Sequence, residues 1–447
     1  MQVRALWWKL VILAGVTVLL SIVLMRIGWV VDERQGRQRE AQQSVAEAQA
    51  GEQVLLGPLL QRSCTEEWES VSGSGAERRV NRERRDFTLS ALPTQLGVDG
   101  EFKQEPRYRG LFKINGYQGR LQLDARWNSL EALQPRSEQP NGRLSCETPR
   151  VMLALSDARG LRSVAVQHEG QALALRPGTR SDAYPRGLHA MLPEQAPTQP
   201  LQLRATVQLV GMSEFALVPA ASATEVKLRS DWPHPSFGGR FLPSARQVGP
   251  QGFQAQWQVS ELASNAVAGV RGGQVVPGLG GEGKQFVDTL NFAMLDPVNP
   301  YVMSDRAIKY GLLFIVLTFV GVGLLELMAQ RRVHPVQYLL VGLAVSLFFL
   351  LLLSLSEHLR FGLSYLLATA AVVGLLGFYG SAMLGRLRSG LVFAALMALL
   401  YGALYVLLNL EQAALVIGTL LLFATLAAVM AATRRFDWYA LGSRISS

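Results

Sequence analysis

Residues 336–356 read VQYLLVGLAVSLFFLLLLSLS, a run of 21 residues without a charged side chain. An α-helix rises about 1.5 Å per residue, so a helix of this length crosses a bilayer hydrocarbon core about 30 Å thick. The run therefore predicts a membrane-spanning helix, and with it an α-helical membrane protein.

Similar apolar runs lie on both sides of this stretch and give the chain its organisation. We expect six membrane-spanning helices, at residues 6–27, 308–329, 336–356, 361–384, 391–410 and 413–433. A segment of ordinary globular composition, residues 32–305, separates the first span from the second. The predicted parts are an N-terminus with an anchor helix (1–31), an inserted domain (32–305), a helical bundle (306–433) and a tail (434–447).

The arginines beside the apolar runs predict which side of the membrane each loop occupies, because short cytoplasmic loops carry an excess of Lys and Arg. The loops 356–360 and 409–412 hold one Arg between them. The second, fourth and sixth spans are instead followed by pairs of arginines: Arg331, Arg332, Arg386, Arg388, Arg434 and Arg435. Both termini are therefore expected in the cytoplasm. The inserted domain is expected outside the cytoplasmic membrane, since long domains cross the membrane whatever their charge.

The first apolar run allows two interpretations. It has the positive start and apolar core of a signal peptide, and Ala48-Gln49-Ala50 has the pattern of a cleavage site. That pattern lies more than 20 residues beyond the core, with charged residues between, so we favour an uncleaved anchor. Cleavage would leave five spans. Residues 33–51 are charged and rich in alanine, and they predict a juxtamembrane helix over 33–50 that ends at Gly51.

Apolar and polar residues alternate in the inserted domain, which is typical of strands with one buried face. The alternation is clear over 201–209 and 253–259, and Leu121 and Leu123 follow it. We expect a β-rich, sandwich-like domain made of one sandwich or two. The glycine-rich stretch 270–285 lacks the strand and helix of a phosphate-binding loop and is predicted to be a flexible loop.

Cys64 and Cys146, the two cysteines of the chain, both fall in the inserted domain. An external compartment is oxidising, so a disulfide between them is one expectation. Two thiols that never meet are the other, because separation in sequence does not determine the distance between two Cα atoms.

The stretch SDWPHPSFGGRFLP at residues 230–243 has the composition of a ligand pocket or a recognition loop. Pro233 and Pro235, on either side of His234, fix two φ angles and remove two backbone N–H donors. The segment is therefore not expected to be an interior strand. We interpret Trp232, Pro233, His234, Pro235 and Phe237 as a structural corner, with a partner-binding edge as the alternative. A metal site is not expected, because His234 has no second ligand at a suitable spacing.

Three charged residues lie at the start of the second span: Asp305, Arg306 and Lys309. One hypothesis is that they couple the inserted domain to the bundle through salt bridges. The alternative is an ordinary membrane boundary, where long side chains bury their stems and keep their charges in water.

Sequence motifs for catalysis are absent from the chain. Its five histidines form no HExxH pattern, and no GxSxG nucleophile elbow occurs. We therefore expect a non-enzymatic protein without a cofactor, a metal ion or catalytic residues. Part of the formal net charge of +9 comes from arginines that set topology, and nucleic acid is not an expected partner.

Five strings resemble the CreD family of bacterial inner-membrane proteins: SDWPHPSFGGRFLP (230–243), GFQAQW (252–257), DRAIKYGLLF (305–314), QRRVHPVQYLLVGLAVSLFFLLLLSLSEH (330–358) and FDWY (436–439). The order of anchor, external domain and bundle is also similar to that family along nearly the whole chain. The resemblance implies a cell inner membrane protein of Gram-negative bacteria that is associated with envelope integrity. It also implies production under a two-component system that responds to envelope stress or nutrients. It implies no catalytic or ligand-binding residues.

Two functions are compatible with these expectations. In the first, the periplasmic domain binds a periplasmic protein or cell-wall material while the bundle holds it in the lipid bilayer. In the second, the chain is a transporter or an export accessory subunit, and its ATPase is a separate chain because no GxxxxGK(S/T) motif is present. An ion-driven carrier is disfavoured, since Glu326 lies toward the end of its span and Glu357 lies in a loop.

Overall fold

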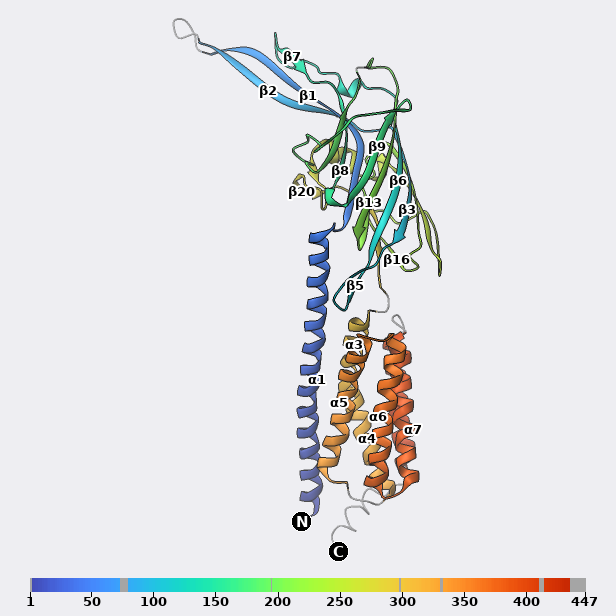
Figure 1. The fold of residues 1–447 in the computed structure, drawn as a ribbon. Helices are drawn as coiled ribbons and strands as arrows, with labels where there is room; N and C mark the ends of the chain where they lie inside the picture. The colour runs from blue at the N-terminus through green and yellow to red at the C-terminus, as the bar shows by residue number, and fades with distance from the viewer. Residues whose placement is uncertain are drawn as a thin grey trace. The chain divides into compact units, whose positions relative to one another are not determined.

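The structure is a computed structural model that describes residues 2–72, 79–193, 195–296, 299–329, 333–409 and 414–434. The chain forms two compact units (Figure 1). The membrane unit comprises residues 1–39 and 298–447, and the β-rich unit comprises residues 40–297. Helix α1 (Gln2–Ala48) contributes its first part to the membrane unit and residues 40–48 to the β-rich unit.

The described part of the membrane unit is helical, as the apolar runs predict. After α1 it contains α3 (Pro300–Lys309), α4 (Gly311–Ala329), α5 (Pro335–Ser356), α6 (Phe361–Leu384), α7 (Leu387–Asn409) and α8 (Ala414–Thr433). Pro335 occupies the first turn of α5, where its missing N–H costs no hydrogen bond. α6 ends at Gly385, whose φ of 68° is the left-handed conformation that glycine adopts without strain.

Four of the described helices are long and apolar enough to cross a membrane: α1, α5, α6 and α7. A fifth span results if the bent pair α3 and α4 is counted as one. The last predicted span, 413–433, corresponds to α8, whose described apolar stretch, Gly418–Ala431, is shorter. The count of six spans therefore stays a prediction.

The second predicted span, 308–329, starts earlier in the structure and is bent. α3 begins at Pro300, directly after Asn299, whose side chain accepts a hydrogen bond from the backbone two residues on. The axes of α3 and α4 differ by 48°. Met303 and Ala307 of α3 are buried in the same apolar cluster as the membrane helices. This packing explains why the compact β-rich unit ends at residue 297, ahead of the predicted boundary at 305.

The β-rich unit contains two large sheets. The nine-stranded sheet has the order β11 (Leu175–Pro177), β12 (Gly187–Met191), β8 (Arg150–Leu155), β1 (Gln53–Ser72), β14 (Glu214–Leu217), β21 (Leu290–Met294) and β16 (Pro235–Gly239), with β2 (Arg79–Ala91) and β7 (Arg143–Cys146) paired to β1. The eight-stranded sheet has the order β10 (Gln171–Ala172), β9 (Leu161–His168), β13 (Leu201–Met212), β6 (Gly116–Trp127), β3 (Gln95–Gln104), β15 (Ala223–Ser230), β18 (Gly252–Ser260) and β17 (Ala245–Gly249). A small hairpin joins β4 (Arg107–Arg109) to β5 (Phe112–Ile114).

The predicted alternation appears in the eight-stranded sheet as one buried and one wet face. Leu201, Leu203 and Ala205 of β13 are buried, whereas the polar residues between them are exposed. β6 pairs with β13 along its whole length, and its buried positions include Leu121 and Leu123. The sequence pattern therefore predicted these strands and their inward faces correctly.

One apolar core lies between the two sheets, so the domain is a single sandwich. Phe102 of the eight-stranded sheet contacts Phe215 and Phe292 of the nine-stranded sheet, with ring centroids 4.8 Å apart in both pairs. All three rings are fully buried. Such aromatic contacts add to the burial of apolar surface that holds the two sheets together.

The prediction of a flexible loop over 270–285 is wrong. The segment follows helix α2 (Ala266–Arg271) and contains β19 (Gln274–Val275), which pairs with β20 (Glu282–Phe286). Val276 and Leu279 are buried in a second apolar cluster of the β-rich unit. The glycines permit tight turns, and these two apolar side chains anchor the segment, a signal that its glycine content obscured.

The predicted juxtamembrane helix is the last part of α1, which ends at Ala48, three residues before Gly51. Ala41 and Val45 pack on Ile114 and Met212 of the β-rich unit. Arg159 donates hydrogen bonds to backbone carbonyl groups in the last turn of α1, at Ala46 and Glu47. A cation at this end of a helix satisfies free carbonyl groups and interacts favourably with the helix dipole.

Candidate functional site: a braced β arm

The second half of strand β1 extends beyond the main path of the nine-stranded sheet and forms a projecting arm with β2 (Figure 1). Residues 53–61 of β1 pair with β14 or β8, whereas residues 62–72 pair with β2 along their whole length and with β7 at its base. We call residues 62–72 and 79–90 the arm. Among the described strands, only β2 pairs with residues 68–72.

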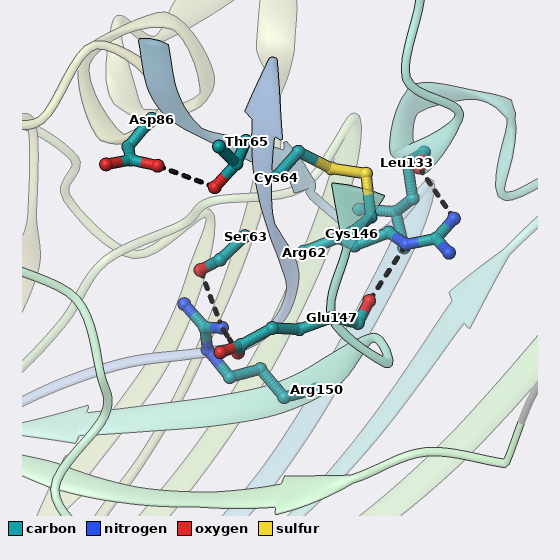
Figure 2. The surroundings of a disulfide bond; sticks show 9 residues. All are labelled: Arg62, Ser63, Cys64, Thr65, Asp86, Leu133, Cys146, Glu147 and Arg150. Carbon is teal, nitrogen blue, oxygen red and sulfur yellow. Dashed lines mark hydrogen bonds and ion pairs between the residues drawn. A yellow bond between two sulfur atoms is a disulfide. The ribbon is translucent and has the colours of Figure 1, made fainter. Parts of the chain in front are cut away.

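A disulfide fastens the base of the arm (Figure 2). Cys64 and Cys146 are opposite partners in β1 and β7, with Cα atoms 4.1 Å apart, and their sulfur atoms are bonded. Arg62 Nε donates a hydrogen bond of 3.0 Å to the carbonyl oxygen of Glu147, the residue that follows the second cysteine. Of the two expectations for the cysteines, the structure therefore has the disulfide.

The carboxylate of Glu66 connects the arm to the loop that precedes β7. Its side chain is fully buried although it lies on a projecting strand. Glu66 Oε1 accepts hydrogen bonds from Ser137 Oγ at 2.8 Å and from the backbone N–H groups of Glu138 and Gln139 at 2.9 and 3.1 Å. The hydrogen bond from Ser137, the two backbone donors and the nearby Arg85 hold the pKa of Glu66 below its ordinary value. Glu66 is therefore ionised at neutral pH and binds strand and loop together.

A buried arginine lies near the disulfide on strand β8 (Figure 2). The side chain of Arg150 is 1% exposed and donates hydrogen bonds of 3.0 Å to Ser63 Oγ and to the carbonyl oxygen of Arg180. Gln61 Oε1 lies 3.4 Å from it, and a carboxylate oxygen of Glu147 lies 3.7 Å from it. Burial lowers the pKa of the Arg150 guanidinium, which still stays charged at neutral pH.

Sequence analysis did not identify either of these buried charges. A usable signal exists for Glu66, because it stands two residues after Cys64 and so shares the face of β1 that a disulfide would cover. Arg150 opens the run RVMLAL, in which every residue is buried. Its hydrogen-bond acceptors come from β1 and from the loop at residue 180, which no local pattern connects to it.

Beyond this base the arm is exposed and carries paired charges on one face. Asp86 accepts hydrogen bonds from Thr65 at 2.6 Å and from Arg84 at 3.0 Å. Trp68 is half-buried, and Val80 on the opposite strand is 57% exposed. A strand pair with an aromatic side chain and a free edge provides a surface for a protein partner. Among the described residues, no group of three or more His, Cys, Asp or Glu side chains could hold a metal ion.

The stretch 230–243 forms a corner in the structure. Trp232 is buried, and its Nε1 donates a hydrogen bond of 2.9 Å to the carbonyl oxygen of His234. Pro233 lies between them in the turn, and the His234 side chain is exposed. Strand β16 then begins at Pro235 and forms the edge of the nine-stranded sheet, paired with β21.

Phe237 connects this edge strand to the facing sheet. Its ring lies 5.3 Å from that of Phe253 and 5.7 Å from that of Trp257, both on β18. The stretch is thus not an interior strand, as its prolines indicate, and its aromatic residues close one end of the sandwich core. Partner binding at the edge of β16 stays a prediction.

In the membrane unit, α1 packs closely against two glycines, one on α4 and one on α5. A Cβ atom on Gly342 of α5 would lie 2.2 Å from Cδ1 of Leu20, and one on Gly311 of α4 would lie 2.9 Å from Cδ1 of Leu24. Leu20 and Leu24 are both buried. Small residues at such contacts let helices approach closely within a membrane.

Two ion pairs fix the ends of this contact. Glu326 accepts hydrogen bonds from Lys9 of α1 at 2.5 Å and from Tyr338 Oη at 2.8 Å. Near the other end of α5, the 7% exposed carboxylate of Glu357 lies 3.3 Å from Arg34 of α1. The sequence analysis placed Glu326 toward the end of its span and Glu357 in a loop, and it did not indicate that both pair with α1.

Of the three charged residues predicted to couple the two units, Asp305 and Lys309 pair with each other on α3. Lys309 Nζ lies 2.7 Å from Asp305 Oδ2, one turn away on α3, and Arg306 lies between them on the same helix. Arg386 lies between α6 and α7, Arg388 lies in the first turn of α7, and Arg434 follows α8. The remaining topology residues, Arg331, Arg332 and Arg435, lie outside the described residues.

Comparison with known proteins gives matches over nearly the whole chain. The family model described as "Inner membrane protein CreD" matches residues 5–439. The protein of that name from Escherichia coli (strain K12) is 34% identical over 437 residues, which cover 97% of this chain and 94% of that protein. Two solved structures of an M1 zinc metallopeptidase from Deinococcus radiodurans, one with a bound Tyr-Ser-Ala substrate, are 10% identical and cover 45% of this chain and 42% of theirs. Their TM-scores of 0.25 and 0.24 support no conclusion on fold or chemistry.

Proposed function

Because the chain belongs to the CreD family of inner membrane proteins, we propose that it is a non-enzymatic envelope protein whose arm binds a protein partner in the periplasm. In this proposal six membrane spans place both termini in the cytoplasm and the β-rich unit outside. Binding of the partner supports the integrity of the cell envelope and its response to stress.

One observation carries the proposal: the arm projects from the sandwich, yet its base is fastened by several independent contacts. These are the Cys64–Cys146 disulfide, the buried Glu66 with its three donors, and the buried Arg150. The sandwich core lies between the two large sheets and does not depend on residues 65–72. A strand pair that is already held in one conformation loses less conformational entropy when a partner binds. A stiff arm therefore favours recognition.

The exposed part of the arm has the composition of a recognition surface. Trp68 offers a large aromatic surface, and tryptophan is enriched among residues that dominate binding energy. On the opposite face of the strand pair from Trp68, Glu67 and Glu69 on β1 stand opposite Arg84 and Arg82 on β2. Such charges set specificity and association rate more than affinity.

The positions of the ion pairs on α1 support the proposed topology. Lys9 and Arg34 are 25 residues apart, which is about 37 Å of helix and slightly more than the thickness of a hydrocarbon core. Their partners lie near opposite ends of α5: Glu326 of α4 contacts Tyr338 close to its start, and Glu357 caps its last turn. This spacing fits two charged layers at the two membrane surfaces.

Photocrosslinking in intact cells tests the proposal. A benzoylphenylalanine residue replaces Val80 on the arm, and as a matched control it replaces Leu262, which is 99% exposed in the same unit. We expect a discrete protein crosslink from position 80 that is absent from position 262 and is reduced by Trp68→Ala. Equal labelling from both positions, or none from position 80, would contradict the proposal. Recovery of an ATPase subunit would instead identify an export accessory.

A further inference from the structure

We propose that a groove between α1 and the bent pair α3–α4 binds one phospholipid with a primary amine headgroup, phosphatidylethanolamine. The groove has a volume of about 410 Å³, and all of its lining residues belong to the membrane unit. The site is separate from the arm and does not depend on the function proposed for it.

The order of residues along α1 matches the order of groups in a phospholipid. The lining residues run from Leu24 and Met25 through Gly28 and Trp29 to Asp32. They change from apolar through aromatic to charged between residues 24 and 32, a rise of about 12 Å along the helix. A phospholipid changes from acyl chain through glycerol to a charged headgroup in the same direction.

The open space of the groove lies beside Gly28. A Cβ atom built on this glycine would meet no atom within 4 Å. Ile308 and Leu312 provide apolar surface on the facing wall. These residues leave room for the glycerol backbone and the first carbons of an acyl chain.

Trp29 places the groove at the membrane surface. Its side chain is 51% exposed, and the guanidinium carbon of Arg26 lies 4.4 Å from its ring centroid. Tryptophan rings of this kind lie at the level of lipid headgroups. The contact with Arg26 orients the ring at the entrance of the groove.

The two charged lining residues have opposite signs, as does a zwitterionic headgroup. The carboxylate of Asp32 forms no hydrogen bond or ion pair with any other side chain or backbone group in the described ranges. Lys309, on the facing wall, is 69% exposed and contacts Asp305. Lys309 can therefore bind the lipid phosphate while the Asp32 carboxylate accepts hydrogen bonds from the lipid ammonium group. A trimethylammonium group cannot donate those hydrogen bonds, so phosphatidylcholine fits less well.

Native mass spectrometry of the full chain, stripped of lipid in detergent, tests this site. The purified protein is titrated with phosphatidylethanolamine, phosphatidylcholine and phosphatidylglycerol. We expect the first lipid to bind about tenfold more tightly than the other two, a ratio equivalent to about 1.4 kcal/mol. Asp32→Asn should abolish this preference. Glu33→Gln, the same chemical change at a residue paired with Arg37, should retain it.

A second pair of variants tests the groove itself. Gly28→Leu fills the open space and favours the helix, so the protein should fold but bind phosphatidylethanolamine about tenfold more weakly. Gly15→Leu is the matched control, because a Cβ atom there also meets nothing within 4 Å and the residue does not line the groove. Equal affinity for the three lipids, preference for phosphatidylglycerol, or unchanged binding in Gly28→Leu would overturn the proposal.

Discussion

Cys64 and Cys146 are opposite partners in the pairing of β1 with β7, so their disulfide joins two strands that the sheet already places side by side. The two residues are 82 positions apart in sequence. The bond therefore closes a long loop that contains the rest of the arm and strands β3 and β6 of the eight-stranded sheet. A cross-link of this kind restricts the unfolded chain and holds the base of the arm in the folded one.

Cys146→Ser should loosen the base of the arm. We expect a loss of about 2–4 kcal/mol in the free energy of unfolding, the usual cost of removing a disulfide that closes a long loop. Hydrogen exchange should speed up more in residues 62–72 than in β13, which pairs with β6 and β9 and responds only to the change in global stability. Ser145→Ala, at the adjacent position of β7, is the control. Unchanged exchange in the arm of Cys146→Ser would show that the disulfide does not stiffen it.

Acid should release the loop that Glu66 holds. The pKa of Glu66 is lower in the folded protein than the ordinary value of about 4.3, so the unfolded state binds more protons at low pH. The stabilisation is fully present above that ordinary value and is lost as the pH falls through the folded pKa. We expect Glu66→Gln to speed hydrogen exchange around residues 137–139 at pH 7. The difference from the wild type should disappear at low pH. A difference that persists after Glu66 is protonated would contradict this assignment.

A larger residue at Gly342 should weaken the packing of α1 against α5. In Gly342→Ala the new methyl group would clash with Leu20, and such overpacking costs about 1–3 kcal/mol. Leu20→Ala in the same chain should recover part of this loss, because it removes the atom that the methyl group meets. Thermal unfolding of the full chain in detergent measures both effects, with Gly15→Ala as the control. The absence of rescue in the double variant would exclude a direct contact between these positions.

The corner at 230–243 should depend on its tryptophan and hardly on its histidine. Trp232→Ala removes a buried ring and should cost about 3–5 kcal/mol of unfolding free energy. His234→Ala keeps the carbonyl oxygen that Trp232 Nε1 contacts and removes only an exposed ring, so its effect should stay within about 0.5 kcal/mol. Chemical denaturation of the two variants distinguishes these values. A large loss in His234→Ala would point to a role beyond the corner.

Features with a local cause could be predicted from the sequence. The membrane helices follow from the length of uncharged runs, and strands such as β13 follow from alternation, here over residues 201–209. The prolines around His234 correctly excluded an interior strand. The break between α3 and α4 was missed, because a bend of 48° at Tyr310 leaves the apolar character of the run unchanged.

The candidate site depends on contacts between distant segments, which no local pattern specifies. Glu66 meets donors 71 to 73 residues away, and Lys9 meets Glu326 across 317 residues. Neither acid has its partner within its own segment of the sequence. These contacts form only when another strand, loop or helix packs against the acid, which requires the tertiary fold.

The arm can meet a periplasmic partner only if the β-rich unit lies outside the cytoplasmic membrane. The most direct test is labelling of single introduced cysteines with a membrane-impermeant maleimide in intact spheroplasts. The unmodified chain serves as the blank, because both of its cysteines are in the disulfide. We predict that Leu262→Cys is labelled in intact spheroplasts and that Arg388→Cys is labelled only after the membrane is permeabilised. Labelling of Arg388→Cys without permeabilisation, with Leu262→Cys protected, would contradict the proposed function.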